Sequence, residues 1–235
     1  MHAVSPEART ELVDWILPFD PGTVGRAKSA VPLKHAAPDV SVLREIEATY
    51  ASRACPVMLR IPVLPTFDGF RHHLAEAGYR EHTITEVQIA DARSMRAVSD
   101  DAPAEVLGAP TDAWASVFLG EGFDPVDGTS RVRKLGQAAG SLFATLLQDD
   151  CPAAAGAASF SHGWASIHGM RTAQGRRGCG LASRVLATLA AAAIARGYQT
   201  IFLQVAADNA PAKSLYERAG FTHAWSYSYW VAPAA

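Results

Sequence analysis

Three glycines and two arginines lie close together in the segment MRTAQGRRGCGLASRVL. Gly175, Gly178 and Gly180 fall between a predicted strand and a predicted helix. A glycine-rich turn at a helix N-terminus lets backbone N–H groups converge without obstruction by Cβ atoms, and the helix dipole adds positive potential there. Arg176 and Arg177 contribute guanidinium groups, which pair well with phosphate oxygens. The segment therefore predicts a site for an anion such as a pyrophosphate.

Two known nucleotide-binding patterns fit this segment poorly. A Walker A loop requires Lys and then Ser or Thr after its last glycine, whereas Leu181 and Ala182 follow Gly180. A Rossmann site has its glycines in the first strand–helix unit and an acidic residue at the end of the next strand. Here the turn comes late, and the next predicted strand ends at residues 204–206 without an acidic side chain. A turn that only tightens a strand–helix connection remains an alternative.

A second motif follows in the segment ADNAPAKSLYERAGF, and together the two motifs resemble the GNAT superfamily of acyl-CoA-dependent N-acyltransferases. The family pattern is an Arg/Gly-rich pyrophosphate loop before a helix, then an Asn after the next strand and a short helical motif. The matching residues of the second motif are Asn209, Ala212, Leu215, Tyr216, Glu217, Ala219, Gly220 and Phe221. The resemblance covers residues 157–230 and extends plausibly from residue 111. It departs at Gly175, where the family commonly has Gln or Arg.

The resemblance implies acetyl-CoA as the acyl donor. The amides of residues 176–182 would bind its diphosphate, the strand edge at residues 167–170 would pair with the pantetheine amides, and Asn209 would hold the pantetheine arm. Tyr216 would be the general acid toward the departing thiolate, because a phenol titrates at about 10 and a thiol at about 8.5. The alternative for Tyr216 is a packed aromatic residue. The expected cofactor-binding residues are His168, Gly169, Met170, Gly175, Arg176, Arg177, Gly178, Cys179, Gly180, Leu181, Ala182, Asn209, Ala212 and Tyr216.

An acceptor amine must lose a proton before it can attack a thioester, so a base is needed. We expect His168 to be this catalytic base, although a lone His in a strand is more often a packed residue. Glu86, His162 and Glu121 are alternatives, and Trp164 is a candidate for the acceptor pocket. Glu86 would serve only if two halves of the chain share a cleft. No metal site is expected.

Hydrophobic periodicity predicts alternating strands and helices along the chain. The predicted strands are residues 14–19, 25–33, 56–63, 79–91, 141–147, 157–170 with a break at 162–163, 200–207 and 222–232. The predicted helices start at residue 39 or 41 and at 66 or 68, and cover residues 111–120, 127–140, 181–195 and 211–220. This pattern and the resemblance together predict an α/β fold with a mixed α+β sheet, the GNAT fold.

An internal repeat aligns residues 74–90 with residues 216–232 and places Gly78 on Gly220 and Tyr79 on Phe221. A glycine after a helix is common, which is the alternative explanation. The repeat predicts two GNAT-like halves in tandem, a degenerate domain at residues 1–92 and a catalytic domain at residues 93–235. The first half has HAAPDVS at residues 35–41 in place of a glycine-rich loop, and Leu74 stands where Tyr216 stands. We therefore expect no second active cofactor site.

Composition excludes several classes of protein. In 235 residues, 49% are hydrophobic, and 21 Lys and Arg face 23 Asp and Glu for a net charge of −2, which argues against a general nucleic-acid binder. Three scattered cysteines form neither a disulfide framework nor a zinc ligand set. No segment predicts a signal peptide or a membrane span, so we expect a cytoplasmic protein without nucleic-acid or membrane partners. The oligomeric state is open, a homodimer included.

The leading hypothesis is an N-acetyltransferase that transfers an acetyl group from acetyl-CoA to a primary amine of a small molecule, amino acid or peptide. The reaction would be a direct attack in a ternary complex. Within the same class, the alternative is acetylation of a protein N-terminus or lysine. From a different class, the alternative is an acyl-CoA-binding sensor or interaction module without turnover.

Overall fold

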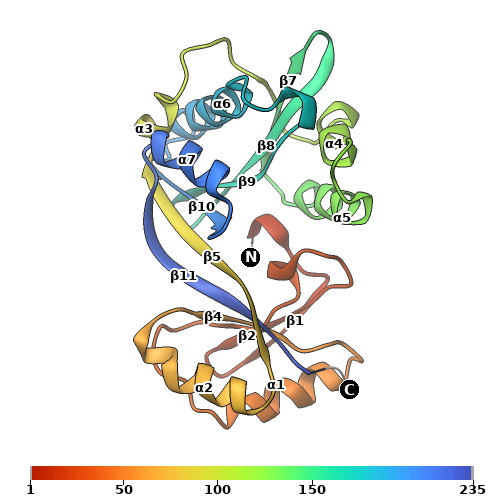
Figure 1. Cartoon of the computed structure of the whole chain (residues 1–235), viewed down its shortest axis with the longest axis vertical. Coiled ribbons are helices and arrows are strands. Elements are labelled where there is room, and N and C mark those ends of the chain that lie inside the picture. The colour runs from red at the N-terminus through yellow and green to blue at the C-terminus, as the bar shows by residue number, and fades with distance from the viewer. Residues whose placement is uncertain (1, 234–235) are drawn as a thin grey trace. The chain divides into compact units, whose positions relative to one another are not determined.

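The computed structural model describes residues 2–233, which fold into two compact units (Figure 1). Unit 1 comprises residues 2–5, Gln88–Val205 and Asn209–His223, and unit 2 comprises residues 6–87, 206–208 and 224–233. These units differ from the single predicted cut between residues 92 and 93. The reason is that two strands, β5 (Arg80–Asp91) and β11 (Thr222–Val231), each contribute residues to both units. The eight-stranded sheet has the order β4-β11-β5-β10-β9-β8-β7-β6.

The strands of unit 1 form a mixed sheet. The sequence-adjacent strands pair antiparallel, and β10 then pairs parallel to β9. These strands are β6 (Glu105–Leu107), β7 (Leu142–Gln148), β8 (Cys151–Ser161), β9 (Trp164–Thr172) and β10 (Thr200–Ala206). A parallel pair requires a crossover, which the long helix after β9 provides. The predicted mixed sheet is confirmed.

Helices cover both faces of this sheet. In Figure 1, α6 lies on one side of β7–β9, and α4 and α5 lie on the other. The helices of unit 1 are α3 (Ala92–Arg96), α4 (Asp112–Leu119), α5 (Pro125–Gly136), α6 (Leu181–Ala195) and α7 (Ala210–Arg218). Helix α3 and strand β6 lie between residues 92 and 110, where the sequence analysis places no helix or strand. Met95 of α3 is fully buried in the same apolar cluster as Val185 of α6, so this stretch belongs to the core of unit 1.

Two helical glycines lie in opposite surroundings and predict opposite effects on stability. A Cβ at Gly128 of α5 would lie 2.3 Å from the carbonyl oxygen of Phe118, so α4 and α5 would have to move apart. A Cβ at Gly69 of α2 (Asp68–Glu76) would meet nothing within 4 Å. We expect Gly128→Ala to lower the free energy of unfolding by about 1–3 kcal/mol. Gly69→Ala should raise it by about 0.5–1 kcal/mol, because alanine loses less backbone entropy in a helix.

Urea unfolding of the two variants beside the wild-type chain measures both effects. Equal destabilisation by the two substitutions would contradict the close α4–α5 approach.

Unit 2 packs two helices on short strands. Strand β1 (Ala8–Leu12) pairs antiparallel with β2 (Trp15–Phe19), and β2 pairs with β3 (Val31–Pro32). Ala30 forms a parallel bridge to Leu59 of β4 (Met58–Pro62), which also pairs with β11. The helices are α1 (Val42–Ala51) and α2 (Asp68–Glu76). The predicted strand at residues 25–33 is mostly irregular, because its first part forms the 3₁₀ turn Gly25–Ala27.

The internal repeat extends over four elements at one constant offset. Adding 142 to the residue numbers carries Asp68–Glu76 of α2 onto Ala210–Arg218 of α7, and the start of β4 onto the start of β10. The same offset places α1 inside α6 and β5 on β11. Both α2 and α7 end at a left-handed glycine, with φ of 81° at Gly78 and 82° at Gly220. The two units therefore contain two copies of one helix–strand–helix–strand motif.

No helix among residues 2–233 combines the length and apolar character needed to cross a membrane.

Candidate active site

The glycine-rich turn lies between β9 and α6, as the sequence predicts. It contains the 3₁₀ turn Gln174–Arg176, and Gly180 forms the N-cap of α6. Gly178 and Gly180 have φ of 78° and 74°, a conformation that side chains disfavour. A Cβ at either glycine would meet no atom within 4 Å. Glycine is therefore favoured at both positions by the backbone conformation and not by close packing.

The N-terminus of α6 lacks a side-chain cap, unlike the other helices of unit 1. Asp91, Thr111, Asp124 and Asn209 each accept a backbone N–H bond at the start of α3, α4, α5 and α7. At α6 the N-cap is Gly180, which has no side chain to accept such a bond. The first N–H groups of a helix need an acceptor, and the helix dipole favours a negative one. The start of α6 therefore fits an anionic group such as a diphosphate.

The two arginines of the turn have weak partners. Arg176 lies 2.8 Å from Asp149, an exposed ion pair worth about 0–1 kcal/mol at most. The Arg177 guanidinium lies 5.8 Å from the ring centre of Phe123. A phosphate can therefore compete for both guanidinium groups, which agrees with their predicted pairing with phosphate oxygens.

A bulge bends β9 just before the turn. Ala155 pairs with Arg171 and Ala157 with His168, so one residue of β8, Gly156, lies opposite two residues of β9, Gly169 and Met170. Gly169 adopts φ of 60° at this point, and a Cβ there would lie 2.7 Å from Leu135 Cδ1. A bulge bends its strand and increases its twist. Glycine is therefore needed at position 169 for two reasons: the positive φ and the lack of space for a Cβ.

Beyond the bulge, β9 and β10 separate. Residues of the two strands pair from Ala165–Ile201 to Ile167–Leu203, although β9 continues to Thr172 and β10 to Ala206. Residues Gly169–Thr172 are half-buried. Unpaired strand backbone can bind an extended ligand that presents peptide-like amides, as a pantetheine arm does. The structure therefore offers a strand edge at the position predicted for this contact.

Asn209 follows β10 and caps α7. Its Oδ1 accepts the N–H of Ala212 at 3.3 Å, and its NH₂ group is not used in this cap. The cap fixes the side chain at the start of α7, directly after the point where β9 and β10 have separated. The donor group remains suited to a carbonyl of the pantetheine arm, and the two roles are compatible.

Tyr216 lies on α7 in the apolar cluster of unit 1. It is 7% exposed, and its ring contacts Phe221 with centroids 5.8 Å apart. Burial raises the pKa of Tyr216 to about 12, so the phenol keeps its proton at neutral pH. No hydrogen bond from its hydroxyl is found within residues 2–233. The repeat places the fully buried Leu74 at the equivalent position of unit 2, so packing there does not require a hydroxyl.

His168 is buried on β9, next to the bulge. Its Nε2 lies 2.8 Å from Ser166 Oγ, and Ser166 in turn donates to the carbonyl oxygen of Ser159. Only 7% of the residue is exposed. This burial favours the packed-residue interpretation, and the role of general base stays a prediction.

The other acceptor candidates are spread over several elements. His162 and Trp164 lie at the β8–β9 hairpin, the end of β9 opposite the turn, about 25 Å away along the strand. Glu86 belongs to the part of β5 that is assigned to unit 2. Glu121 is exposed in the loop between α4 and α5. Cys179 is exposed within the turn itself.

The loop between α4 and α5 contributes residues that the sequence analysis missed. Arg171 of β9 lies 4.5 Å from the ring centre of Phe123 and 3.4 Å from Asp127 of α5. Burial lowers the pKa of Arg171, the neighbouring Arg131 and Arg177 lower it further, and Asp127 opposes this shift. Phe123 therefore lies close to two guanidinium groups, one on β9 and one in the turn. Nothing in the local sequence around Phe123 signals this long-range contact.

Gly122 brings the same loop against the turn. A Cβ at this position would lie 2.0 Å from Oε1 of Gln174, and the residue has φ of 81°. The α4–α5 loop thus forms part of the surroundings of the candidate cofactor site.

Comparison with known proteins finds a matching family model and similar folds. A family model described as "Probable histone acetyltransferase Rv0428c C-terminal" matches residues 3–230. A search of curated proteins finds no match. Among solved structures, a functionally unknown conserved protein from Staphylococcus epidermidis ATCC 12228 superimposes with a TM-score of 0.74 at 11% identity, covering 98% of this chain and 96% of that one.

Two further structures carry acetyltransferase descriptions. A GCN5-related N-acetyltransferase from Kribbella flavida has a TM-score of 0.69 at 15% identity and covers 98% of this chain and 91% of its own. A tandem GNAT protein from the clavulanic acid biosynthesis pathway has a TM-score of 0.65 at 15% identity, and the match covers 94% of this chain and 78% of that one. At these identities the likeness shows the fold, and the predicted GNAT fold is confirmed.

Proposed function

Because the chain belongs to the family described as "Probable histone acetyltransferase Rv0428c C-terminal", we propose that it transfers an acetyl group from acetyl-CoA to a primary amine, with unit 1 as the catalytic unit. The GNAT fold supports acyl transfer in general. One observation carries the proposal: unit 1 combines a helix start at Gly180 without a side-chain cap and an edge of β9 that does not pair with β10 beyond Ile167.

The residues of unit 1 have distinct proposed roles. The N–H groups at the start of α6, with Arg176 and Arg177, bind the diphosphate. The backbone of β9 beyond the bulge and the amide of Asn209 bind the pantetheine arm. The bound donor supplies a thioester whose carbonyl carbon is open to attack by an amine.

Transfer requires proton movements at nitrogen and at sulfur. The acceptor ammonium loses a proton to a base or to water, and its nitrogen then attacks the thioester carbon. As the carbon–sulfur bond breaks, the Tyr216 hydroxyl donates its proton to the sulfur. The nitrogen, now bonded to the acetyl carbon, releases its second proton to solvent, and the phenolate recovers a proton from solvent, which leaves the neutral amide and the free thiol. The raised pKa of Tyr216 keeps the donor protonated before this step.

The acceptor is proposed to be the primary amine of a small molecule, amino acid or peptide. The family description favours a second candidate, the amine of a lysine in a basic protein. A thiol-release assay with acetyl-CoA separates these acceptors when small amines, amino acids and lysine-containing basic peptides are compared. Release that depends on an acceptor amine supports transfer. Tight CoA binding without release above the background for any acceptor would instead indicate an acyl-CoA-binding module.

A further inference from the structure

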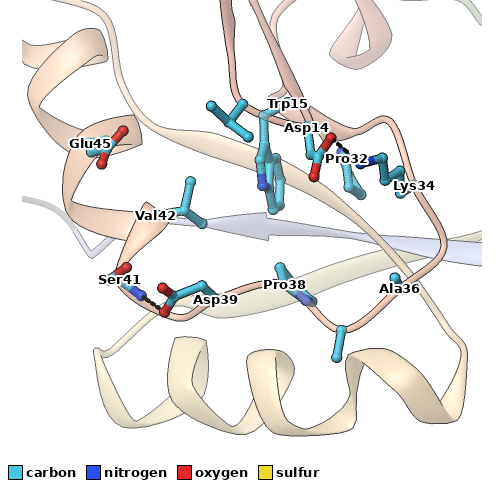
Figure 2. A pocket seen from close by; sticks show the side chains of 12 residues that line it. Asp14, Trp15, Pro32, Lys34, Ala36, Pro38, Asp39, Ser41, Val42 and Glu45 are labelled. Atoms are coloured by element: carbon cyan, nitrogen blue, oxygen red, sulfur yellow. Dashed lines mark hydrogen bonds and ion pairs between the residues drawn. The ribbon is translucent and has the colours of Figure 1, made fainter.

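Unit 2 contains a pocket of about 290 Å³, shown in Figure 2. The turn between β1 and β2, residue Pro32 of β3, the loop at residues 34–41 and the first turns of α1 bound it. Its volume is near the lower end of the roughly 300–1,000 Å³ typical of small-ligand sites. The pocket is therefore sized for a side chain or a small molecule.

The repeat places this pocket where unit 1 has its cofactor turn. The offset of 142 carries residues 34–41 onto residues 176–183, the turn and the start of α6. Here, however, Asp39 precedes the helix, and its Oδ1 accepts the N–H of Ser41 at 2.9 Å. This backbone hydrogen bond lowers the pKa of Asp39, which stays ionised. A carboxylate of the chain itself thus lies where unit 1 offers room for an anion.

The charged groups lining the pocket are mainly acidic. Asp14 and Lys34 form an ion pair at 2.8 Å, which leaves Asp39 and Glu45 as the remaining charged side chains. Figure 2 shows the Glu45 and Asp39 carboxylates along the same side of the pocket as Val42 and Ser41. Two carboxylates without a cationic partner favour a cationic ligand and disfavour a diphosphate.

Trp15 supplies a second and independent sign of a ligand. The residue is 2% exposed, its ring packs 5.6 Å from that of Phe70, and it lines the pocket. No hydrogen bond from its indole nitrogen is found within residues 2–233. In Figure 2 the indole extends into the middle of the pocket, with its nitrogen toward the side of Val42. The indole nitrogen itself is not among the fully enclosed polar atoms without a partner, so its N–H is open to the pocket and can donate to a ligand oxygen there.

We propose that this pocket binds a basic side chain of a peptide, with Asp39 and Glu45 holding its guanidinium or ammonium group and the Trp15 N–H donating to a carbonyl oxygen of the same peptide. The site is separate from the cofactor turn and does not depend on acyl transfer. It gives unit 2 a binding function of its own, although its helix start has lost the features of a CoA site.

Calorimetry on the full chain tests the proposal with an N-acetylated, C-amidated Gly-Arg-Gly peptide. We expect binding that weakens about 10-fold or more on Asp39→Asn and on Glu45→Gln, because each removes the negative charge that strengthens a hydrogen bond to the cationic group. Asparagine is also a good residue near a helix start, so Asp39→Asn should fold. Glu81→Gln, an exposed acidic residue of β5 in the same unit, is the matched control and should leave affinity unchanged.

Agmatine, which has the guanidinium group but no carbonyl oxygen, tests the role of Trp15. Trp15→Phe should weaken peptide binding and leave agmatine binding unchanged. Saturating CoA should not displace the peptide, because the two ligands occupy different units. The proposal is overturned by absence of peptide binding at millimolar concentration, by equal effects of Glu45→Gln and Glu81→Gln, or by displacement of the peptide by CoA.

Discussion

Tyr216→Phe should lower kcat for acetyl transfer by about 100-fold or more and change CoA affinity little, because it removes the proposed proton donor and keeps the ring. The hydroxyl makes no hydrogen bond within the described residues, and Leu74 fills the equivalent place in unit 2. The substitution should therefore leave the free energy of unfolding nearly unchanged. Steady-state kinetics, CoA titration and urea unfolding of the same variant separate these three effects.

Tyr198→Phe provides the matched control. Tyr198 is a partly buried tyrosine beside the same apolar cluster, and its ring contacts Phe160 at 5.0 Å. Its loss of a hydroxyl should leave kcat unchanged. A Tyr216→Phe enzyme with the same kcat as wild type would show that the thiolate obtains its proton elsewhere.

The pH dependence of the wild-type enzyme follows from the same burial. Because the pKa of Tyr216 rises from 10 to about 12, the phenol stays protonated throughout the usual assay range. The folded state holds this proton more tightly than the unfolded state, so the stabilisation is present below pH 10 and is lost between pH 10 and 12. Kinetics should show no alkaline loss of kcat from this group below about pH 10.

Local sequence signals predicted the parts of the site that depend on neighbouring residues. The glycine-rich turn before α6 and the helix that ends before Gly220 follow from short-range patterns. These features need only a few consecutive residues, which is why their positions agree with the structure. The constant repeat offset also followed from local patterns, since both copies end a helix at a glycine before an aromatic residue.

Features that depend on distant residues did not follow from the sequence. The contact of Phe123 with Arg171 joins the α4–α5 loop to β9, and the bulge at Gly169 depends on packing against Leu135. The contribution of β5 and β11 to both units likewise depends on which strands pair. Periodicity identifies a strand but does not name its partner. A single predicted boundary at residue 92 therefore could not account for β11, whose residues belong to both units.

Replacing Gly178 and Gly180 together by alanine should abolish most CoA binding, with a rise in Kd of at least about 100-fold. Alanine at φ of 78° and 74° costs roughly 1–2 kcal/mol per residue. The turn escapes this strain by changing conformation, and its N–H groups then no longer converge on the diphosphate. Each hydrogen bond lost to a charged group is worth about 1.5–3 kcal/mol, so two lost bonds account for the expected change.

Gly197→Ala separates the loss of the binding turn from general backbone strain. Gly197 has φ of 83° after the end of α6, and a Cβ there also meets nothing within 4 Å, so its substitution carries similar strain. We expect it to lower the free energy of unfolding by about 1–2 kcal/mol and to leave the Kd for CoA unchanged. Calorimetric titration with CoA measures both variants. Equal weakening of CoA binding by both would mean that the affinity reflects overall stability, whereas loss confined to the Gly178 and Gly180 variant assigns the diphosphate to the start of α6.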